Sequence, residues 1–367
     1  MVAGFTVHSG PHHVPHRDMT HHSRPPGHAP RVTILMPVYN GEKYLAAAME
    51  SILDQTFRDF ILLIIDDGSS DSSLAIARSF GDPRVQVERN PKNLGLVKTL
   101  NRGLDLVQTE FVARMDCDDI ALPDRLEKQI AFLDENPDIG MCGTAYELFH
   151  ESLRQTIRPP CRHEEIVYGL LDDNVFLHSS VIVRMEVLNR HGLRYREDYR
   201  LAEDYELWAR LARYTHIGNL PQVLVRYRSH PENVSNTNKG EQIATRDRVR
   251  LEHLESFGLA PAADQKTLHI DLFSLAFQGS PDQLADARRW LEALARAVST
   301  RCGLPLGRLH RDFALLWYSA CGRSAHHGLT VLFSYLKSAM AWKGPKSYIL
   351  KLLFRCLMRD PIPAVTK

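Results

Sequence analysis

Short apolar runs alternate with amphipathic stretches over residues 32–115, and this alternation limits the fold more than any other feature of the sequence. The apolar runs are residues 32–37, 60–65, 85–88 and 111–115, and the stretches with helical spacing are residues 42–55, 71–80 and 96–106. Apolar runs of this length, bounded by turn residues, are typical of buried parallel strands. Strand–helix alternation implies right-handed crossovers. We therefore predict an α/β fold with a mostly parallel sheet and helices on both faces.

Three of the predicted strands end in polar clusters. The clusters are Pro37-Val38-Tyr39-Asn40, Asp66-Asp67-Gly68-Ser69 and Asp116-Cys117-Asp118-Asp119. In open α/β sheets, ligands bind beyond the carboxyl ends of the strands. The common placement of the clusters predicts a ligand site at that edge of the sheet.

The third cluster places three carboxylates close together directly after a strand. Such carboxylates repel one another unless a hard divalent cation lies between them. Mg²⁺ or Mn²⁺ takes one or two protein carboxylates and completes its shell with phosphate oxygens and water, which suits a diphosphate ligand. The alternative is a solvated acidic turn that begins the next helix, with Pro123 near its first turn.

Two further acidic features have both a structural and a chemical interpretation. Asp and Ser favour turns and helix N-caps, yet Asp67 at a strand tip could accept a hydrogen bond from a nucleobase on which Tyr39 stacks. Glu203-Asp204 precedes an apolar helical face and so marks a helix start, where the helix dipole favours anions. A carboxylate at this position could also deprotonate a sugar hydroxyl.

Five motifs occur in an order and at a spacing that resemble the family-2 glycosyltransferases of the GT-A fold. They are Ile34-Leu35-Met36-Pro37-Val38-Tyr39-Asn40, Ile65-Asp66-Asp67-Gly68-Ser69-Ser70-Asp71, Asn93-Leu94-Gly95-Leu96, Met115-Asp116-Cys117-Asp118-Asp119 and Ala202-Glu203-Asp204-Tyr205. The resemblance covers residues 31–235. It implies a Rossmann-like sheet and an enzyme of the hexosyltransferase type that transfers a sugar from a nucleotide-diphosphate sugar with inversion.

The resemblance also implies a donor site. The residues that would line the nucleotide pocket are Pro37, Tyr39 and Glu42. Asp67 would bind the base, which in the family is usually uracil. Asp116 and Asp118 match the family's D-x-D pair: Asp118 would hold Mn²⁺ or Mg²⁺, and Asp116 would lie near the ribose or a phosphate.

On the acceptor side, Asp204 matches the family's general base and Glu203 would orient it. We expect the helix N-terminus to keep Asp204 ionised near neutral pH. By the same resemblance, His178 would approach a sugar, and Arg228 and His230 would reach the diphosphate or the metal. For each of these last three residues the alternative is a packed, hydrogen-bonded structural role.

Composition narrows the partners and the compartment. The formal net charge is +1, so no bulk attraction to nucleic acid follows, and we expect no nucleic-acid partner. The six cysteines show no C-x-x-C or zinc-like spacing, which favours reduced thiols. Without an apolar signal core or a run long enough to span a bilayer, the sequence predicts a cytoplasmic protein.

Three segments differ in character. Residues 1–30 are rich in His and Pro and are expected to be a disordered tail, residues 31–240 to form the catalytic domain, and residues 241–367 to form a helical appendage. Helices are expected at residues 284–298, 309–319, 329–342 and 348–358. Residues 343–359, which include the last of these helices, are basic and very apolar, so this stretch could lie at the inner face of the membrane as a peripheral contact or pack on its own domain or a partner subunit.

The predicted acceptor is a glycan or a lipid-linked molecule, in polysaccharide or cell-surface glycan synthesis. Two other functions stay open at this point: a sugar nucleotidyltransferase and a non-catalytic nucleotide-sugar-binding protein. The first needs a Gly-rich basic loop after the first strand, and residues 37–42 lack one. The carboxylates Asp116, Asp118 and Asp204 argue against lost catalysis.

Overall fold

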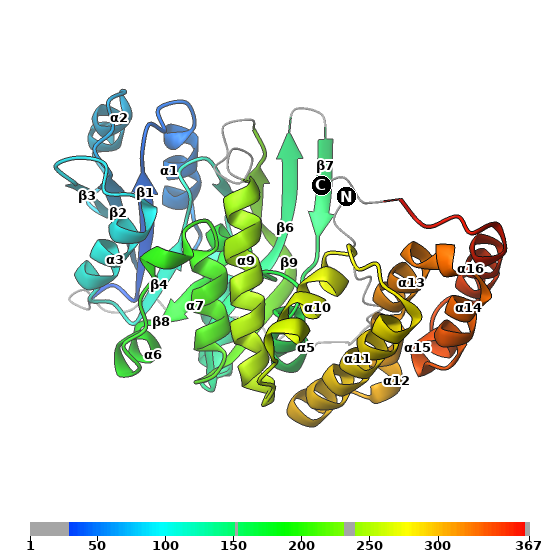
Figure 1. The fold of residues 1–367 in the computed structure, drawn as a ribbon. Helices are drawn as coiled ribbons and strands as arrows, with labels where there is room; N and C mark the ends of the chain where they lie inside the picture. Colours follow the sequence, from blue (N-terminus) through cyan, green and yellow to red (C-terminus); the bar gives the residue numbers. More distant parts are fainter. Residues whose placement is uncertain (1–28, 151–152, 231–238, 364–367) are drawn as a thin grey trace. The chain divides into compact units, whose positions relative to one another are not determined.

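The computed structural model describes residues 29–150, 153–230 and 239–363 (Figure 1). The chain forms two compact units, which divide between Val249 and Arg250. The boundary predicted after residue 240 falls inside helix α9 (Lys239–His253), which runs through the division. The predicted tail at residues 1–30 lies outside the described residues except for its last two.

The first unit begins with four parallel strands. They are β1 (Val32–Val38), β2 (Phe60–Asp66), β3 (Val85–Arg89) and β4 (Phe111–Arg114), arranged β3-β2-β1-β4. Each predicted strand is present and its ends agree within a residue. The neighbours pair in register from Val32 with Phe60 and from Val32 with Phe111, so the carboxyl ends of β1, β2 and β4 lie at one edge.

Beyond β4 the sheet is mixed, and within the described residues it has nine strands. The further strands are β8 (Ile182–Arg184), β6 (Ile139–His150), β9 (His216–Arg228), β5 (Ile120–Ala121) and β7 (Leu153–Ile157). β8 lies antiparallel to both β4 and β6, whereas β6 and β9 are parallel. The predicted α/β class is confirmed. The uninterrupted run of parallel strands ends at β4, where the regular strand–helix alternation of the sequence ends, and beyond it only the pair β6–β9 is parallel among the described strands.

Helices cover both faces of the sheet, as predicted. Alternate residues of β1, from Val32 to Val38, pack in one apolar core with α1 (Leu45–Leu53) and α4 (Arg125–Glu135). Leu35 points to the other face, where α3 (Leu96–Leu106), α6 (Met185–Arg190) and α7 (Glu203–Leu211) contribute to the lining of a small pocket. Among the described residues, this unit also contains α2 (Ser73–Ser79), α5 (His163–Gly169) and most of α9.

The second unit is helical. Its helices are α10 (Ala263–Phe273), α11 (Pro281–Cys302), α12 (Leu306–Asp312), α13 (Ala314–Arg323), α14 (Leu329–Leu336), α15 (Ala339–Lys343) and α16 (Lys346–Met358). The helix predicted at residues 309–319 is two helices that meet at Phe313. The helix predicted at residues 329–342 is also divided, because the Ser338 hydroxyl accepts a hydrogen bond from the Met340 N–H and starts a new helix. None of the helices in the described ranges is long and apolar enough to cross a bilayer.

Candidate active site

The turns that follow β1 and β2 are joined by hydrogen bonds. The backbone N–H of Asn40 donates to the Ser69 hydroxyl at 3.0 Å, and the side-chain oxygen of Asn40 accepts from the Ser70 N–H at 2.9 Å. Asn40 adopts a left-handed backbone conformation, with φ at 49°, that a short polar side chain tolerates. The two predicted clusters therefore form one surface at the carboxyl edge of the sheet.

The three residues predicted to line the nucleotide pocket differ in their exposure and in their hydrogen bonds. Tyr39 is 51% exposed, so its ring is open to a ligand. The Glu42 carboxylate accepts a hydrogen bond from the Ser72 N–H at 2.9 Å, which ties it to the start of α2. Pro37 pairs with Ile65 of β2. The pairing of β1 with β4 ends before it, at Leu35, so the N–H that proline lacks costs no hydrogen bond to β4.

Asp67 is buried and its carboxylate is already engaged. It accepts hydrogen bonds from the Asn90 side chain at 2.7 Å and from the backbone N–H groups of Leu94 and Gly95 at 2.9 and 3.0 Å. The turn at Gly68 can approach the loop at residues 92–95 because glycine has no Cβ and tolerates a φ of 74°. A Cβ on Gly68 would lie 2.6 Å from the Lys92 carbonyl carbon. Asp67 therefore holds the turn after β2 against the loop at Leu94 and Gly95, and its contact with a base stays a prediction.

Asp116 follows β4 and is held on two sides. One carboxylate oxygen accepts from the Arg114 guanidinium at 2.6 Å and the other from the Ser179 hydroxyl at 2.7 Å. Burial raises the pKa of Asp116, but the adjacent Arg114 cation, with His178 and Ser179, outweighs burial and brings the pKa below its usual value. Asp116 is thus a fixed carboxylate.

Asp118 pairs with His230, a residue far away in the sequence. Nε2 of His230 lies 3.0 Å from a carboxylate oxygen of Asp118. Burial and the nearby Asp116 raise the pKa of Asp118, against the contribution of His230. The structure thus brings together the two residues predicted to bind the metal.

Arg228 secures the same loop from the end of β9. Its Nε donates to the Asp118 carbonyl at 2.9 Å, and its backbone N–H donates to the buried Asp119 carboxylate at 2.9 Å. The guanidinium lies over the rings of Tyr44 and Phe149 at 4.5 and 4.6 Å from their centroids. Arg228 therefore has a structural role at residues 118–119, and its contact with a diphosphate stays a prediction.

His178 lies in a short turn, His178–Ser180, before β8. Its Nε2 lies 2.9 Å from the Tyr195 hydroxyl, and its ring meets Trp208 edge-on at 6.0 Å. Burial lowers the pKa of His178 to about 3, so the imidazole is neutral at physiological pH. A neutral, hydrogen-bonded imidazole can position a sugar hydroxyl but carries no charge to a diphosphate.

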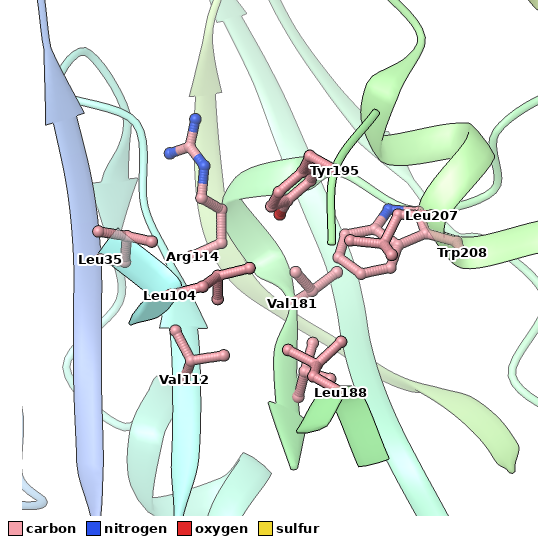
Figure 2. Close-up of a pocket in the computed structure, with 10 residues that line it drawn as sticks. Leu35, Leu104, Val112, Arg114, Val181, Leu188, Tyr195, Leu207 and Trp208 are labelled. Atoms are coloured by element: carbon pink, nitrogen blue, oxygen red, sulfur yellow. The ribbon is translucent and has the colours of Figure 1, made fainter. Parts of the chain in front are cut away.

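Beneath this site lies the small pocket of the α3, α6 and α7 face (Figure 2). Leu35, Leu104, Val112, Leu188 and Leu207 form most of its apolar lining. Figure 2 shows Tyr195 and Trp208 on one side of the pocket and Arg114 on the other, with the Arg114 guanidinium directed away from the apolar residues. The pocket is too apolar for a diphosphate, and we interpret it as the packed support of Arg114 and Tyr195.

Glu203 and Asp204 are the first two residues of α7. The Asp204 carboxylate accepts hydrogen bonds from the Asn174 side chain and from the Tyr205 N–H, both at 2.7 Å. Burial and the neighbouring Glu203 raise the pKa of Asp204 to about 7. Asp204 is therefore only partly ionised near neutral pH, because desolvation and the like charge of Glu203 act against the helix N-terminus that we expect to keep it ionised.

Arg114 links the two acidic groups of the site. Burial raises the pKa of Asp116, of Glu203 and of Asp204, and the Arg114 cation opposes that rise in each case. The Arg114 side chain is itself only 4% exposed. Carboxylates from two distant motifs are thus influenced by one buried guanidinium, which bonds Asp116 directly.

Several residues of the site carry no signal in the motifs. They are the partners of the predicted carboxylates and imidazole: Asn90, Arg114, Asn174, Ser179 and Tyr195. Arg114 could have been found, because a cation inside the apolar run of residues 111–115 requires a buried counter-charge. Ser179 directly follows the predicted His178, whereas Asn90, Asn174 and Tyr195 lie in segments with no recognisable spacing.

Asp118 and His230 form a donor set that fits a divalent cation. No cluster of three His, Cys, Asp or Glu side chains suited to a metal occurs among the described residues. The protein would therefore contribute these two ligands and leave the other positions to phosphate oxygens and water. That division is typical of Mg²⁺ and Mn²⁺ sites that bind a nucleotide.

Comparison with known proteins agrees with this architecture. The profile of the family described as Glycosyl transferase family 2 matches residues 33–191. An uncharacterised glycosyltransferase of Haemophilus influenzae is 31% identical over 237 residues, which are 61% of this chain and 73% of that protein. The amylovoran biosynthesis glycosyltransferase AmsE of Erwinia amylovora is 36% identical over 210 residues, or 55% of this chain and 78% of that protein.

Among solved structures, S. aureus TarS 1–349 in complex with UDP-GlcNAc has the same fold. The TM-score is 0.54 at 18% identity, over 85% of this chain and 91% of that chain. The fold and the carboxylate-lined edge of the sheet define a GT-A glycosyltransferase. The family profile and the two relatives show that the chain belongs to glycosyltransferase family 2.

Proposed function

We propose that this enzyme transfers a sugar from a nucleotide-diphosphate sugar, UDP-linked, to a glycan or lipid-linked acceptor with inversion of the anomeric centre. One observation carries the proposal: Asp204, a buried carboxyl group whose pKa is raised to about 7, belongs to the same unit as the Asp118–His230 pair and the carboxyl edge of the sheet. TarS, which has the same fold, is known in complexes with UDP and with UDP-GlcNAc, which supports the choice of UDP.

The donor would bind across the tips of β1, β2 and β4. The exposed ring of Tyr39 would stack on the base, beside the turn that Asp67 and Gly68 hold in place. Pro37 and Glu42 would complete the wall of the nucleotide pocket. Asp116, fixed by Arg114 and Ser179, would face the ribose or the first phosphate.

Asp118 and His230 would hold Mn²⁺ or Mg²⁺ at the diphosphate. The cation, when bound, neutralises the negative charge that grows on the departing diphosphate. The neutral His178 would contribute a hydrogen bond to the transferred sugar. Arg228 would add a positive charge beside the same phosphates while it holds the loop through the Asp118 carbonyl.

Asp204 would act as the general base. In an inverting transfer, the acceptor hydroxyl oxygen bonds to the anomeric carbon, the bond from that carbon to the diphosphate oxygen breaks, and the hydroxyl proton moves to the base. A base with a pKa of about 7 suits this step, because it is largely ionised just above neutral pH and still basic enough to take the proton. Asn174 would hold the carboxylate in place and Glu203 would orient it.

The cellular role would be polysaccharide or cell-surface glycan synthesis at the cytoplasmic side of a membrane. The relative named for amylovoran biosynthesis supports this class of product. A peripheral contact through the C-terminal basic helix would place the enzyme near lipid-linked acceptors.

A donor screen by thermal shift tests the proposal. With Mn²⁺ present, we expect a UDP-sugar to raise the melting temperature by several degrees, and we expect EDTA to abolish the effect. We expect Tyr39→Ala to weaken the shift, because it removes the stacking ring, while Tyr214→Ala, a similarly exposed tyrosine of the same unit, should leave it unchanged. Equal shifts with and without metal would contradict the role of Asp118 and His230.

A further inference from the structure

The second unit exposes a set of large apolar side chains. Among the described residues, every large apolar side chain that is at least 60% exposed lies between Phe333 and Met358. These side chains, named here the outer apolar surface, are Phe333, Trp342, Leu350, Phe354, Leu357 and Met358. Single exposed apolar residues are ordinary, but a set confined to one region marks an interaction surface.

Helix α16 carries four of these residues on one face. Leu350, Phe354, Leu357 and Met358 follow the spacing that aligns side chains along a helix. Leu352 and Cys356, which the same spacing places on the other side, are buried in the unit. Packing within the unit explains the inward face of α16 and leaves the outward apolar face without a function.

The two remaining residues lie on neighbouring helices. Phe333 belongs to α14 and Trp342 to α15, and both helices pack against α16. Figure 1 shows the three helices together at the end of the chain. The outer apolar surface is therefore one local feature of the second unit.

The segment that carries this surface is free of acidic residues up to Asp360, whose carboxylate pairs with Arg355 at 3.0 Å. No Asp or Glu occurs between Asp312 and Asp360, although the chain as a whole has a net charge of only +1. The basic residues in this interval are Arg323, Lys337, Lys343, Lys346, Lys351, Arg355 and Arg359. Lys346 and Lys351 are exposed and, by helical spacing, flank the apolar stripe of α16 on either side.

We propose that the outer apolar surface binds in the interface of an anionic lipid bilayer. The α16 stripe would face the acyl chains, Trp342 would lie at the headgroup level, and the lysines would meet the lipid phosphates. A second copy of the chain fits less well, because a symmetric contact would bring two sets of cations together. This lipid contact does not require the transferase activity.

Vesicle flotation of the full chain tests the proposal. Vesicles of phosphatidylcholine alone are compared with vesicles of phosphatidylcholine and phosphatidylglycerol in equal parts. We expect binding to the anionic vesicles that weakens as salt rises, and little binding to the neutral ones. We expect Leu350→Gln/Phe354→Gln to weaken binding by about tenfold or more, because two apolar groups no longer enter the interface.

Two further variants complete the experiment. Lys346→Gln/Lys351→Gln should lose most of the salt-dependent part of the binding, by about tenfold at low salt. Leu106→Gln/Leu153→Gln, which changes exposed leucines of the first unit, should bind as the wild type does. Release of nucleotide diphosphate with a water-soluble acceptor is measured in parallel, so that a failed membrane proposal is distinguished from a failed transferase proposal.

Two outcomes would overturn the proposal. One is a folded wild-type chain that does not float with anionic vesicles, or that floats equally well after Leu350→Gln/Phe354→Gln. The other is a wild-type dimer, measured by light scattering, that becomes a monomer in Leu350→Gln/Phe354→Gln, with no vesicle binding by either protein. That second result would assign the surface to a contact between copies of the chain.

Discussion

At the scale of single residues, the chemistry depends on how burial changes each titratable group. Asp116 and Asp204 both lie near the Arg114 cation, yet the pKa of Asp116 falls and that of Asp204 rises to about 7. The difference follows from their immediate partners, because Asp116 bonds the guanidinium directly whereas Asp204 lies beside Glu203. Two carboxylates are thus separated into a permanent anion and a candidate base.

This separation predicts a pH dependence. Asp204 must be ionised to accept a proton, and its pKa is raised, so kcat/KM should rise with pH and level off above about pH 7. Below that pH the rate should fall about tenfold per unit, as for a single protonation. Initial rates of nucleotide-diphosphate release across pH measure the profile.

His178 supplies the control for this profile, since a histidine is the usual group that titrates near neutrality. Its pKa of about 3 lies far below the tested range. We therefore expect His178→Asn to lower the rate without moving the limb near pH 7. Disappearance of the limb in this variant would assign the base to His178 instead of Asp204.

The proposed metal ligands, Asp118 and His230, give a second prediction about single residues. His230→Ala removes a ligand while the fold of β9 is kept, so the Mn²⁺ concentration for half-maximal activity should rise by about tenfold or more. His216→Ala is a matched control, because His216 also lies beside a carboxylate, that of Asp138, at 2.8 Å, but on the exposed surface. A metal titration in which both variants respond alike would contradict the assignment of His230.

At the scale of elements, the strand tips are held by close contacts. Gly68 needs both a positive φ and the space of a missing Cβ, because the loop backbone at Lys92 and Asn93 lies within 2.6 and 2.7 Å of where a Cβ would be. That contact places the N–H groups of Leu94 and Gly95 on Asp67. The turn and the loop therefore act as one structural piece.

We expect Gly68→Ala to destabilise the first unit by about 2–4 kcal/mol, because backbone strain and a backbone clash act together. Gly192→Ala is the matched control: it has a positive φ of 58° but open space around a Cβ, so it should cost only about 1–2 kcal/mol. Urea unfolding curves measure both. Equal losses would show that the contact with the 92–93 backbone contributes nothing.

The strands and the predicted site residues follow from local sequence. The runs that form β1, β2 and β4 have the periodicity of buried strands, and each is followed at once by its polar cluster. The pairing Asp118–His230 follows from the family resemblance and from no local pattern, because it depends on where β9 ends. The pairing Asp204–Asn174 could not be predicted, because it depends on how the segment before β8 is placed. The breaks at Phe313 and Ser338 were missed because an apolar pattern continues through each one.

At the scale of the whole molecule, the chain divides its tasks between two units. The first contains every predicted site residue, from Pro37 to His230. The second contains the outer apolar surface and the acid-free interval before Asp360. Chemistry and the proposed lipid contact thus belong to separate units, so variants of one surface should leave the other activity intact.

The central claim is that Asp204 is the base of a sugar transfer that uses a nucleotide-diphosphate donor. The most direct test is release of nucleotide diphosphate from a panel of donors, with Mn²⁺ and acceptor, by the wild type and by Asp204→Asn. We expect release from a UDP-sugar by the wild type, and a loss of about 10²–10⁴-fold in kcat for the variant while donor binding by thermal shift is retained. Equal release by the two proteins with every donor would contradict the account.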